Sequence, residues 1–334
     1  RLHDFLMLDI PAIDTVELTQ IIYPTLDSFQ LEDIASSLGY DLLNAHDALA
    51  DAKATVYVFK ELFKKVTKLP LVTLEKLEKL SSSTTHETFL FFREALSYAR
   101  NFKAPLAEDL VVVNQLAMKN PEHLTVHETQ SEKTSYPFSK EEKEKYLPSD
   151  YSFREVQAEM MDLIYNYLNA DLSLEKLAIE VPPGVGKSLG YLFPAAFIAT
   201  PKKPIVISTY TTVLQNQLID ETLPVLEKML HRKIKTTLVK SSEHYLSLSV
   251  FERWLKQITA EDSEAYLSMR ILVRLTETTT GDLSEINAGS HLDLSFWHDI
   301  RATKNQYTDD YWKDYDFYER IKATSKDSEI IITN

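Results

Sequence analysis

One stretch of the chain, residues 177–196 (LAIEVPPGVGKSLGYLFPAA), constrains the fold more than any other. The apolar run 177–181 predicts a buried parallel strand. A tight loop with two glycines follows it, and Lys187-Ser188 open a helix. In such a loop backbone N–H groups surround a β-phosphate, the lysine reaches the β- and γ-phosphates, and the serine hydroxyl binds Mg²⁺. The stretch predicts a site for ATP and Mg²⁺, formed by Gly184, Val185, Gly186, Lys187 and Ser188.

Two residues depart from the strict phosphate-loop pattern. Val181 stands where the pattern has a glycine, and Pro183 removes one N–H group from the loop. The alternative interpretation is a Gly-Lys-Ser turn before an ordinary helix. We favour the phosphate loop because it directly follows a strand-like run.

The composition limits the class of protein. A length of 334 residues is enough for two domains or parts of domains. The net charge of -14 argues against a broadly basic, nucleic-acid-coating surface, although a narrow basic channel on an acidic body would suffice for DNA. The absence of cysteine excludes disulfides and suits a reducing cytoplasm, and no apolar run is long enough for a membrane span. Because the chain starts without Met, we expect further segments on both sides of it.

A second candidate site lies near the N-terminus, where His46 precedes a predicted helix and Asp51 lies one turn into it. A carboxylate can hold Mg²⁺ or Mn²⁺, and a histidine beside it can deprotonate a water molecule. From the spacing alone, an ordinary exposed helix start is the favoured interpretation. The predicted helix runs to about Lys65, and its predicted apolar face consists of Leu49, Ala52, Val56, Phe59 and Phe63.

The run 44–55 (NAHDALADAKAT) resembles the third motif of DEDDh 3′–5′ exonucleases, the family of the DNA polymerase III epsilon subunit. The segments 14–18, 23–24 and 31–35 are similar to the preceding part of that family. The resemblance implies that residues 1–66 are the C-terminal part of an RNase H-like exonuclease domain. It also implies that His46 is the general base and Asp51 a metal ligand. The family's other carboxylate motifs would lie upstream of Arg1, and we expect Asp14 only to start a helix.

Residues 67–150 predict a helical connector that ends in a linker. Leucines at a spacing of three predict a helix over 73–80, and residues 87–102 fit another. Its aromatic side chains could stack on bases, but their helical period favours core packing. Residues 121–150 are polar and end in the charge run 140–145, which predicts a solvated linker.

The second half predicts a parallel α/β domain. Strands are predicted over 204–209, 234–239 and 329–333, alternating with helices. Arg154 and Gln157 open a helix some thirty residues before the phosphate loop, where a guanidinium and an amide could hold an adenine. Thr209, Thr211 and Gln217 follow the first of these strands. They suit contacts with a nucleic-acid backbone, although hydroxyls and amides at a strand end are equally typical of a helix N-cap.

These features resemble the first motor domain of superfamily 2 helicases of the DinG/XPD kind. The similar segments are Arg154 with Gln157, 184–192, 208–218 and 240–248. The resemblance implies that 151–334 is the N-terminal part of a RecA-like motor, with a helical insert over about 245–325. In that family the cysteine of a Tyr-Leu-Cys-Leu run begins an iron–sulfur site. Ser247 stands at that position, so no iron–sulfur cluster is expected. The DEAH box would follow Asn334.

Together the two resemblances predict an ATP-dependent, helicase-like DNA motor fused to a 3′–5′ exonuclease, acting on single-stranded DNA or 3′ ends in repair or replication. One alternative is an exonuclease whose ATP-binding domain regulates it without unwinding. Another, of a different class, is a P-loop kinase with a regulatory helical module. The insert is rich in aromatic residues, and its acidity favours a packed helical structure over a stacking platform for DNA.

Overall fold

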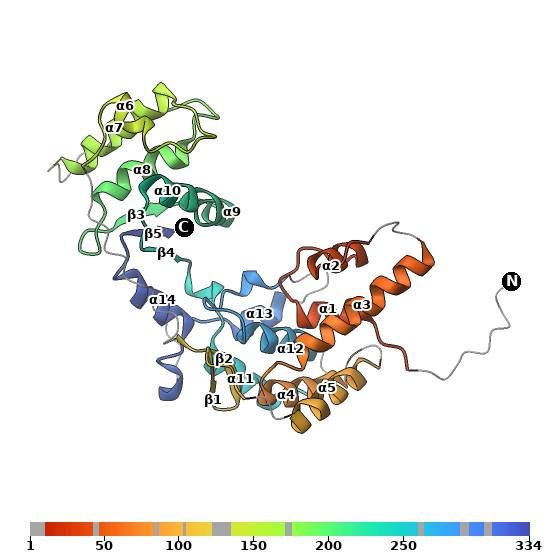
Figure 1. Cartoon of the computed structure of the whole chain (residues 1–334). Helices are drawn as coiled ribbons and strands as arrows, with labels where there is room; N and C mark the ends of the chain where they lie inside the picture. The colour runs from red at the N-terminus through yellow and green to blue at the C-terminus, as the bar shows by residue number, and fades with distance from the viewer. Residues whose placement is uncertain are drawn as a thin grey trace. The chain divides into compact units, whose positions relative to one another are not determined.

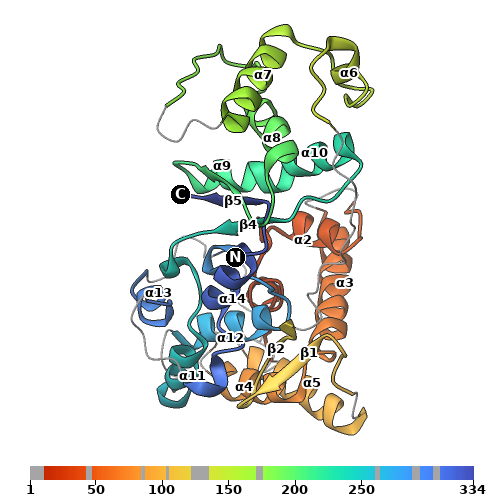
Figure 2. The same cartoon turned by 90° about the vertical axis from the view of Figure 1, so that its left-hand side faces the viewer.

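A computed structural model describes residues 11–42, 47–82, 84, 87–102, 105–121, 135–170, 176–259, 264–287, 294–303 and 309–334. The chain divides into two compact units (Figures 1 and 2). The first unit comprises residues 1–125 and 242–317, and the second comprises residues 126–241 and 318–334. Each unit is therefore built from two separate stretches of the chain.

The first unit begins with three helices. They are α1 (Thr15–Ile22), α2 (Leu31–Ser37) and α3 (Ala48–Val66). Asp14 caps α1 by accepting the backbone N–H groups of Val16 and Glu17, so it starts the helix as predicted. Thr15, which the pattern 15–23 also offered as a cap, is instead the first residue of the helix. Gly39 follows α2 with a φ of +86°, the left-handed conformation that ends many helices.

The predicted apolar face of α3 is wrong in part. Leu49 and Val56 are 64% and 54% exposed, and the side chains that α3 buries lie at a strict spacing of four. These buried residues are Ala54, Val58, Leu62 and Val66. The partners decide which face is buried: α1 and α2 pack against α3, and Phe91 of α5 meets Phe59 and Phe63 edge to face. Periodicity alone defines a helix and leaves open which of two apolar stripes meets the core.

A helical pair and a β-hairpin complete the N-terminal part of the first unit. The pair is α4 (Leu71–Ser81) and α5 (Thr88–Phe102), as the leucine and aromatic spacing predicts. The hairpin, which the sequence analysis missed, is β1 (Leu110–Val113) and β2 (Leu116–Lys119), paired antiparallel. Its two-residue turn has positive φ at Asn114 and Gln115, the geometry of the turn that matches strand twist. Leu116, Ala117 and Met118 of β2 are buried, and β2 packs on α4 and α12.

The predicted insert folds as short helices within the first unit. They are η3 (Ser242–His244), α11 (Leu248–Gln257), α12 (Glu264–Leu275), η4 (Leu283–Glu285), α13 (Leu294–Ile300) and η5 (Asp310–Trp312). The Trp312 side chain is fully buried, which agrees with a packed structure rather than a stacking platform. Tyr307, which we also placed among the insert's aromatic residues, lies outside the described residues. Ser247 caps α11 by accepting the N–H of Val250.

Glu252 of α11 joins this insert to the hairpin. Its buried carboxylate accepts hydrogen bonds from Trp312 Nε1 (2.8 Å), Tyr311 Oη (2.8 Å) and Asn114 Nδ2 (2.5 Å), and it pairs with Lys256. Burial alone would raise the pKa of Glu252, but the hydrogen bonds from Lys256, Trp312, Tyr311 and Asn114 outweigh it and lower the pKa. The insert thus has a polar hub that joins α11 and η5 to the hairpin.

The insert is also fastened to the N-terminal helices. α12 packs on α1 and α4, and most of its side chains are buried. Asn287 donates its side-chain amide to the carbonyls of Leu26 (2.6 Å) and Asp27 (3.2 Å), and Lys65 pairs with Glu277. Residues that resemble the exonuclease family and residues that resemble the motor insert therefore share one hydrophobic core.

The second unit is an α/β layer structure around a parallel sheet. Its strands are β3 (Ile205–Ser208), β4 (Thr236–Val239) and β5 (Ile330–Thr333), in the order β3-β5-β4. Ile205 pairs with Ile330, which also pairs with Thr236, so the three predicted strands and their parallel direction are confirmed. The helices are α6 (Lys140–Glu144), α7 (Glu155–Asn169), α8 (Lys187–Ile198), α9 (Thr212–Gln217), η2 (Leu218–Thr222), α10 (Leu223–Leu230) and α14 (Phe317–Ser325). The last of these starts at the end of the first unit.

The prediction of a buried strand over 177–181 is wrong. These residues belong to no strand, and Leu177 is 41% exposed. A parallel strand needs a neighbour to complete its hydrogen bonds. In the described sheet β5 is already flanked on both sides, and neither outer strand pairs with 177–181. The apolar run is thus strand-like in composition, but it forms no backbone pairing with a strand of the described sheet.

Residues 135–147 also differ from the predicted solvated linker. Ser139 and Glu142 form a reciprocal capping box at the start of α6. Lys143 is buried and pairs with Asp162 at 2.8 Å, and Tyr136 stacks on Tyr165 of α7. The charge run therefore forms a short helix whose lysine is held inside the second unit.

Candidate functional site: a phosphate-loop cavity

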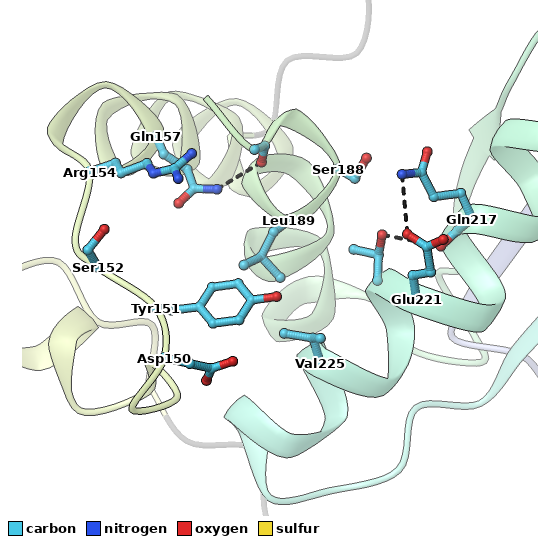
Figure 3. Close-up of a pocket in the computed structure, with 12 residues that line it drawn as sticks. Asp150, Tyr151, Ser152, Arg154, Gln157, Ser188, Leu189, Gln217, Glu221 and Val225 are labelled. Carbon is cyan, nitrogen blue, oxygen red and sulfur yellow. Dashed lines mark hydrogen bonds between the residues drawn. The ribbon is translucent and has the colours of Figure 1, made fainter. Parts of the chain in front are cut away.

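A cavity of about 480 Å³ in the second unit gathers most of the residues predicted to bind a nucleotide (Figure 3). Arg154 and Gln157 line it from the start of α7, and Gly186 and Ser188 line it from the phosphate loop and α8. Gln217 and Glu221 line it from α9 and η2. This volume lies within the range of small-molecule sites in proteins.

The two loop glycines have the backbone conformation that a phosphate loop requires. Gly184 and Gly186 have φ of +78° and +87°, in the left-handed region that side chains disfavour. Gly186 immediately precedes α8, so the free N–H groups of the helix start lie at the cavity. A Cβ at Gly184 would meet no atom within 4 Å, which leaves room for a ligand beside the loop. The loop therefore suits an anion such as a phosphate.

Arg154 and Gln157 hold this loop through its carbonyl oxygens. Gln157 Nε2 donates to the carbonyl of Gly186 at 2.8 Å (Figure 3). The guanidinium of Arg154 donates to the carbonyl of Gly184. Gln157 is almost fully buried, and a Cβ at Gly186 would lie 2.4 Å from its Nε2. The two side chains that we expected to contact adenine are thus hydrogen-bonded to the predicted phosphate loop.

The other predicted loop residues surround the start of α8. Lys187 is the first residue of that helix and is exposed, as a residue that reaches a phosphate must be. Ser188 lines the cavity, and its side chain hydrogen-bonds to Tyr191 one turn later. Burial raises the pKa of Tyr191, and this hydrogen bond partly offsets the effect. Val185 is half-buried between the two glycines.

The residues predicted to contact a nucleic acid divide between two places. Thr211 caps α9 by accepting the N–H of Leu214 at 3.2 Å, and Thr209 Oγ1 donates to the carbonyl of Thr211 at 3.3 Å. Gln217 instead lies in the wall of the phosphate-loop cavity, where its amide donates to Glu221 at 3.4 Å. The structure therefore brings Gln217 together with Arg154 and Gln157 rather than with the two threonines.

The sequence analysis missed Glu221 and gave Tyr151 no separate role. In Figure 3 the ring of Tyr151 lies between Arg154 and Asp150 and points across the cavity toward Val225. Glu221 belongs to η2, a π-helical turn that interrupts α9 and α10, and such turns are frequent at functional sites. Nothing in the local sequence marks this turn. Tyr151 is an aromatic residue just before α7, the helix for which an adenine contact was predicted.

The second candidate site is present only in part. Asp51 lies half-buried in the first turn of α3, behind the cap Asp47, and Thr55 donates to its backbone carbonyl at 2.8 Å. His46 lies outside the described residues. Across the described part of the chain, no three His, Asp or Glu side chains gather as metal ligands. Asp51 alone could supply one of the ligands that a Mg²⁺ or Mn²⁺ ion needs.

The chain is similar over nearly its whole length to proteins named 3′–5′ exonuclease DinG. The Bacillus subtilis (strain 168) protein is 32% identical over 343 residues, which cover 99% of this chain and 35% of that protein. The proteins of Staphylococcus aureus strains bovine RF122/ET3-1 and USA300 are each 32% identical over 331 residues. In both cases the match covers 97% of this chain and 35% of the relative. No protein-family model matches the chain.

The chain thus spans about a third of the length of these relatives. None of the helices in the described residues has the length and apolar character that a membrane span requires. The similarity extends across both units, so it includes the region of Asp51 as well as the phosphate loop. It supports the resemblance to DinG proteins.

Proposed function

We propose that this chain is part of an ATP-dependent enzyme of DNA metabolism, in which a helicase-like motor is coupled to a 3′–5′ exonuclease. One observation carries the proposal. Arg154 donates a hydrogen bond to the carbonyl of Gly184 and Gln157 donates one to the carbonyl of Gly186, beside a cavity that Ser188 also lines. The relatives named 3′–5′ exonuclease DinG support the nuclease part.

In this proposal ATP binds along the cavity with its phosphates at the start of α8. The N–H groups of the loop and the ammonium of Lys187 bind the β- and γ-phosphates, and Ser188 turns from Tyr191 toward Mg²⁺. The Gln157 amide contacts the adenine while it still holds Gly186. Occupation of the base site therefore fixes the conformation of the phosphate loop.

The nuclease part acts on DNA with 3′ ends. Asp51 would supply one ligand of a Mg²⁺ or Mn²⁺ ion, which would provide Lewis-acid activation for phosphodiester hydrolysis, and His46 would act as the general base. Thr209 and Thr211 contact the DNA backbone at the motor. Motor and nuclease thus act on one bound DNA molecule.

A second candidate function is an exonuclease that ATP regulates without unwinding. The observation that favours it is Ser247, which caps α11 where the related helicases begin an iron–sulfur site. A motor that lacks this cluster lacks the wedge proposed to separate strands. ATP would then change only the rate of trimming.

The test compares Lys187→Ala with Lys202→Ala, an exposed lysine away from the cavity, in the full-length protein. We expect Lys187→Ala to reduce DNA-stimulated ATP hydrolysis at least about 100-fold, because transition-state charge stabilisation is lost, and Lys202→Ala to leave it unchanged. Strand separation measured in parallel distinguishes the two candidates, since ATP hydrolysis without unwound product supports the second. ATP hydrolysis that DNA never stimulates would favour a kinase.

A further inference from the structure

A second cavity, in the first unit, is distinct from the phosphate-loop site and has a different chemistry. Its volume is about 570 Å³, and it lies where α3 leads into α4, beside the end of α5 and strand β1. Aliphatic side chains line most of it: Leu69, Pro70, Leu71, Leu106, Leu110 and Val112. Leu71, Leu106 and Val112 are 44%, 44% and 40% exposed. A concave apolar surface of this kind marks a binding site more often than a flat one does.

The cavity borders an open strand edge. In a hairpin with a two-residue turn, the flanking residues Val113 and Leu116 form a hydrogen-bonded pair, and the pairs alternate from there. Val112 and Ala117 are therefore a non-hydrogen-bonded pair, so the N–H and C=O of Val112 point away from β2. No strand in the described part of the chain pairs with this edge of β1. Leu110 also points its backbone groups away from β2, but its N–H already donates to the carbonyl of Ala107 at 3.0 Å, so an added chain would pair through Val112 and the carbonyl of Leu110. A short edge of this kind is a template for another extended chain.

The edge and the cavity meet at the same residues. Leu110 and Val112 line the cavity with their side chains, and both lie on the same face of the hairpin because they are two positions apart. In a strand added to β1, every second side chain would lie on that face as well. Such a chain would satisfy the backbone of Val112 and place a bulky side chain in the cavity.

The charges around this cavity are basic, unlike those of the chain as a whole. Lys68 and Arg100 line it, and no carboxylate is among its described lining residues. Arg100 pairs with Glu75 at 2.9 Å, but both partners are about half exposed, and pairs of this kind contribute little stability. In a chain of net charge -14, two cations at an apolar cavity favour an acidic partner.

We propose that this cavity and the open edge of β1 form a docking site for an extended, acidic peptide segment of a partner protein. The segment adds a strand to β1, inserts a large apolar side chain between Leu71, Leu106 and Val112, and places a carboxylate at Lys68 or Arg100. Main-chain hydrogen bonds provide affinity in this mode, and the cavity provides specificity.

A single strand of nucleic acid is the competing occupant, and the observations favour the peptide. The lining residues include no aromatic side chain on which a base could stack. The alternating N–H and C=O groups of a strand edge match a peptide backbone and have no counterpart in a phosphodiester chain.

The test measures fluorescence anisotropy of a labelled peptide, Glu-Thr-Phe-Thr-Phe-Thr-Glu, on the full chain. We expect saturable binding that Leu106→Asp and Arg100→Glu each weaken at least tenfold. The matched controls are Leu163→Asp, an exposed leucine of the second unit, and Arg93→Glu, an exposed arginine of α5 outside the cavity. Both controls should bind as the unchanged chain does.

A second measurement leaves the protein unaltered. Two versions of the peptide carry N-methyl groups on opposite sets of alternate amides, and only the set that faces β1 should abolish binding. The proposal is overturned if the peptide does not bind, if the controls weaken it equally, or if both methylated peptides bind alike. It is also overturned if oligothymidylate binds this cavity instead, with losses in the same two variants.

Discussion

The two candidate sites differ in how much of each this chain assembles. At the phosphate loop, residues from α7, the loop, α8 and η2 meet around one cavity, joined by direct hydrogen bonds. At Asp51, no cluster of metal ligands forms among the described residues. A phosphate site uses mainly backbone N–H groups and one helix start, which a single loop can provide. A metal site needs several carboxylates, which must come from separate segments.

The largest expected effect concerns Asp51 and would break this comparison. In the full-length protein, Asp51→Asn and His46→Ala should each reduce metal-dependent 3′ trimming by about 1,000-fold or more, through the loss of metal binding or of the general base. Asp47→Asn is the control, because Asn also caps helices and Asp47 serves α3 only as its cap. Trimming is measured with end-labelled DNA. Unchanged rates in both variants would show that Asp51 has no catalytic role.

The packing of α3 gives the next effect and sharpens the contrast between its two faces. Leu62 is fully buried, so Leu62→Ala should lower the free energy of unfolding by about 2–5 kcal/mol. Leu49 is 64% exposed, and Leu49→Ala should change the free energy of unfolding by less than about 0.5 kcal/mol. Urea unfolding measures both. Equal losses would mean that the stripe first predicted from the sequence is buried.

The Glu252 hub is expected to contribute less, and its effect depends on pH. Glu252→Gln leaves one acceptor oxygen for four donors and should lower stability by about 2 kcal/mol at pH 7. The pKa of Glu252 is lowered by folding, so its contribution is fully present above the ordinary value of 4.5 and is lost as the pH falls through the folded value.

The measurement for Glu252 is urea unfolding of the unchanged and variant chains at pH 7 and at decreasing pH. The difference between them should shrink below pH 4.5, where the unfolded-state carboxyl takes up its proton. Glu94→Gln, on the exposed side of α5, is the control and should have no effect. A difference that stays constant with pH would argue that the charge of Glu252 is unimportant.

The smallest effect tests the hold of Gln157 on the phosphate loop. Gly186→Ala should weaken binding of a fluorescent ATP analogue about tenfold, for two reasons. The alanine would have to keep a positive φ, and its Cβ would collide with the side chain of Gln157. Gly184→Ala has the same backbone cost without that contact. Because Gln157 also serves the proposed site, Gln157→Ala should itself weaken binding, but by less in the Gly186 variant than in the Gly184 variant. An equal loss in the two variants would contradict the contact.

The parts of the fold that followed from local pattern were predictable. Each of these parts is indicated by residues close together in the chain. The leucine spacing indicates α4, the polar residues Asp14 and Thr211 stand at helix starts, and the β-branched runs indicate β3, β4 and β5. The hairpin was missed because Asn114-Gln115 is not among the usual turn pairs, although its φ angles are those of such a turn. The run 177–181 has strand composition, but composition cannot report whether a partner strand is present.

By itself the sequence determined the helix that carries Asp51 and the three parallel strands, because each depends on residues close together in the chain. Only the tertiary structure decided which face of α3 is buried, that Gln217 lines the same cavity as Arg154 and Gln157, and that residues 242–317 lie in one unit with the N-terminal helices. These outcomes depend on contacts between residues far apart in sequence. Such contacts are chosen by the shape and burial of the partners, which no local pattern records.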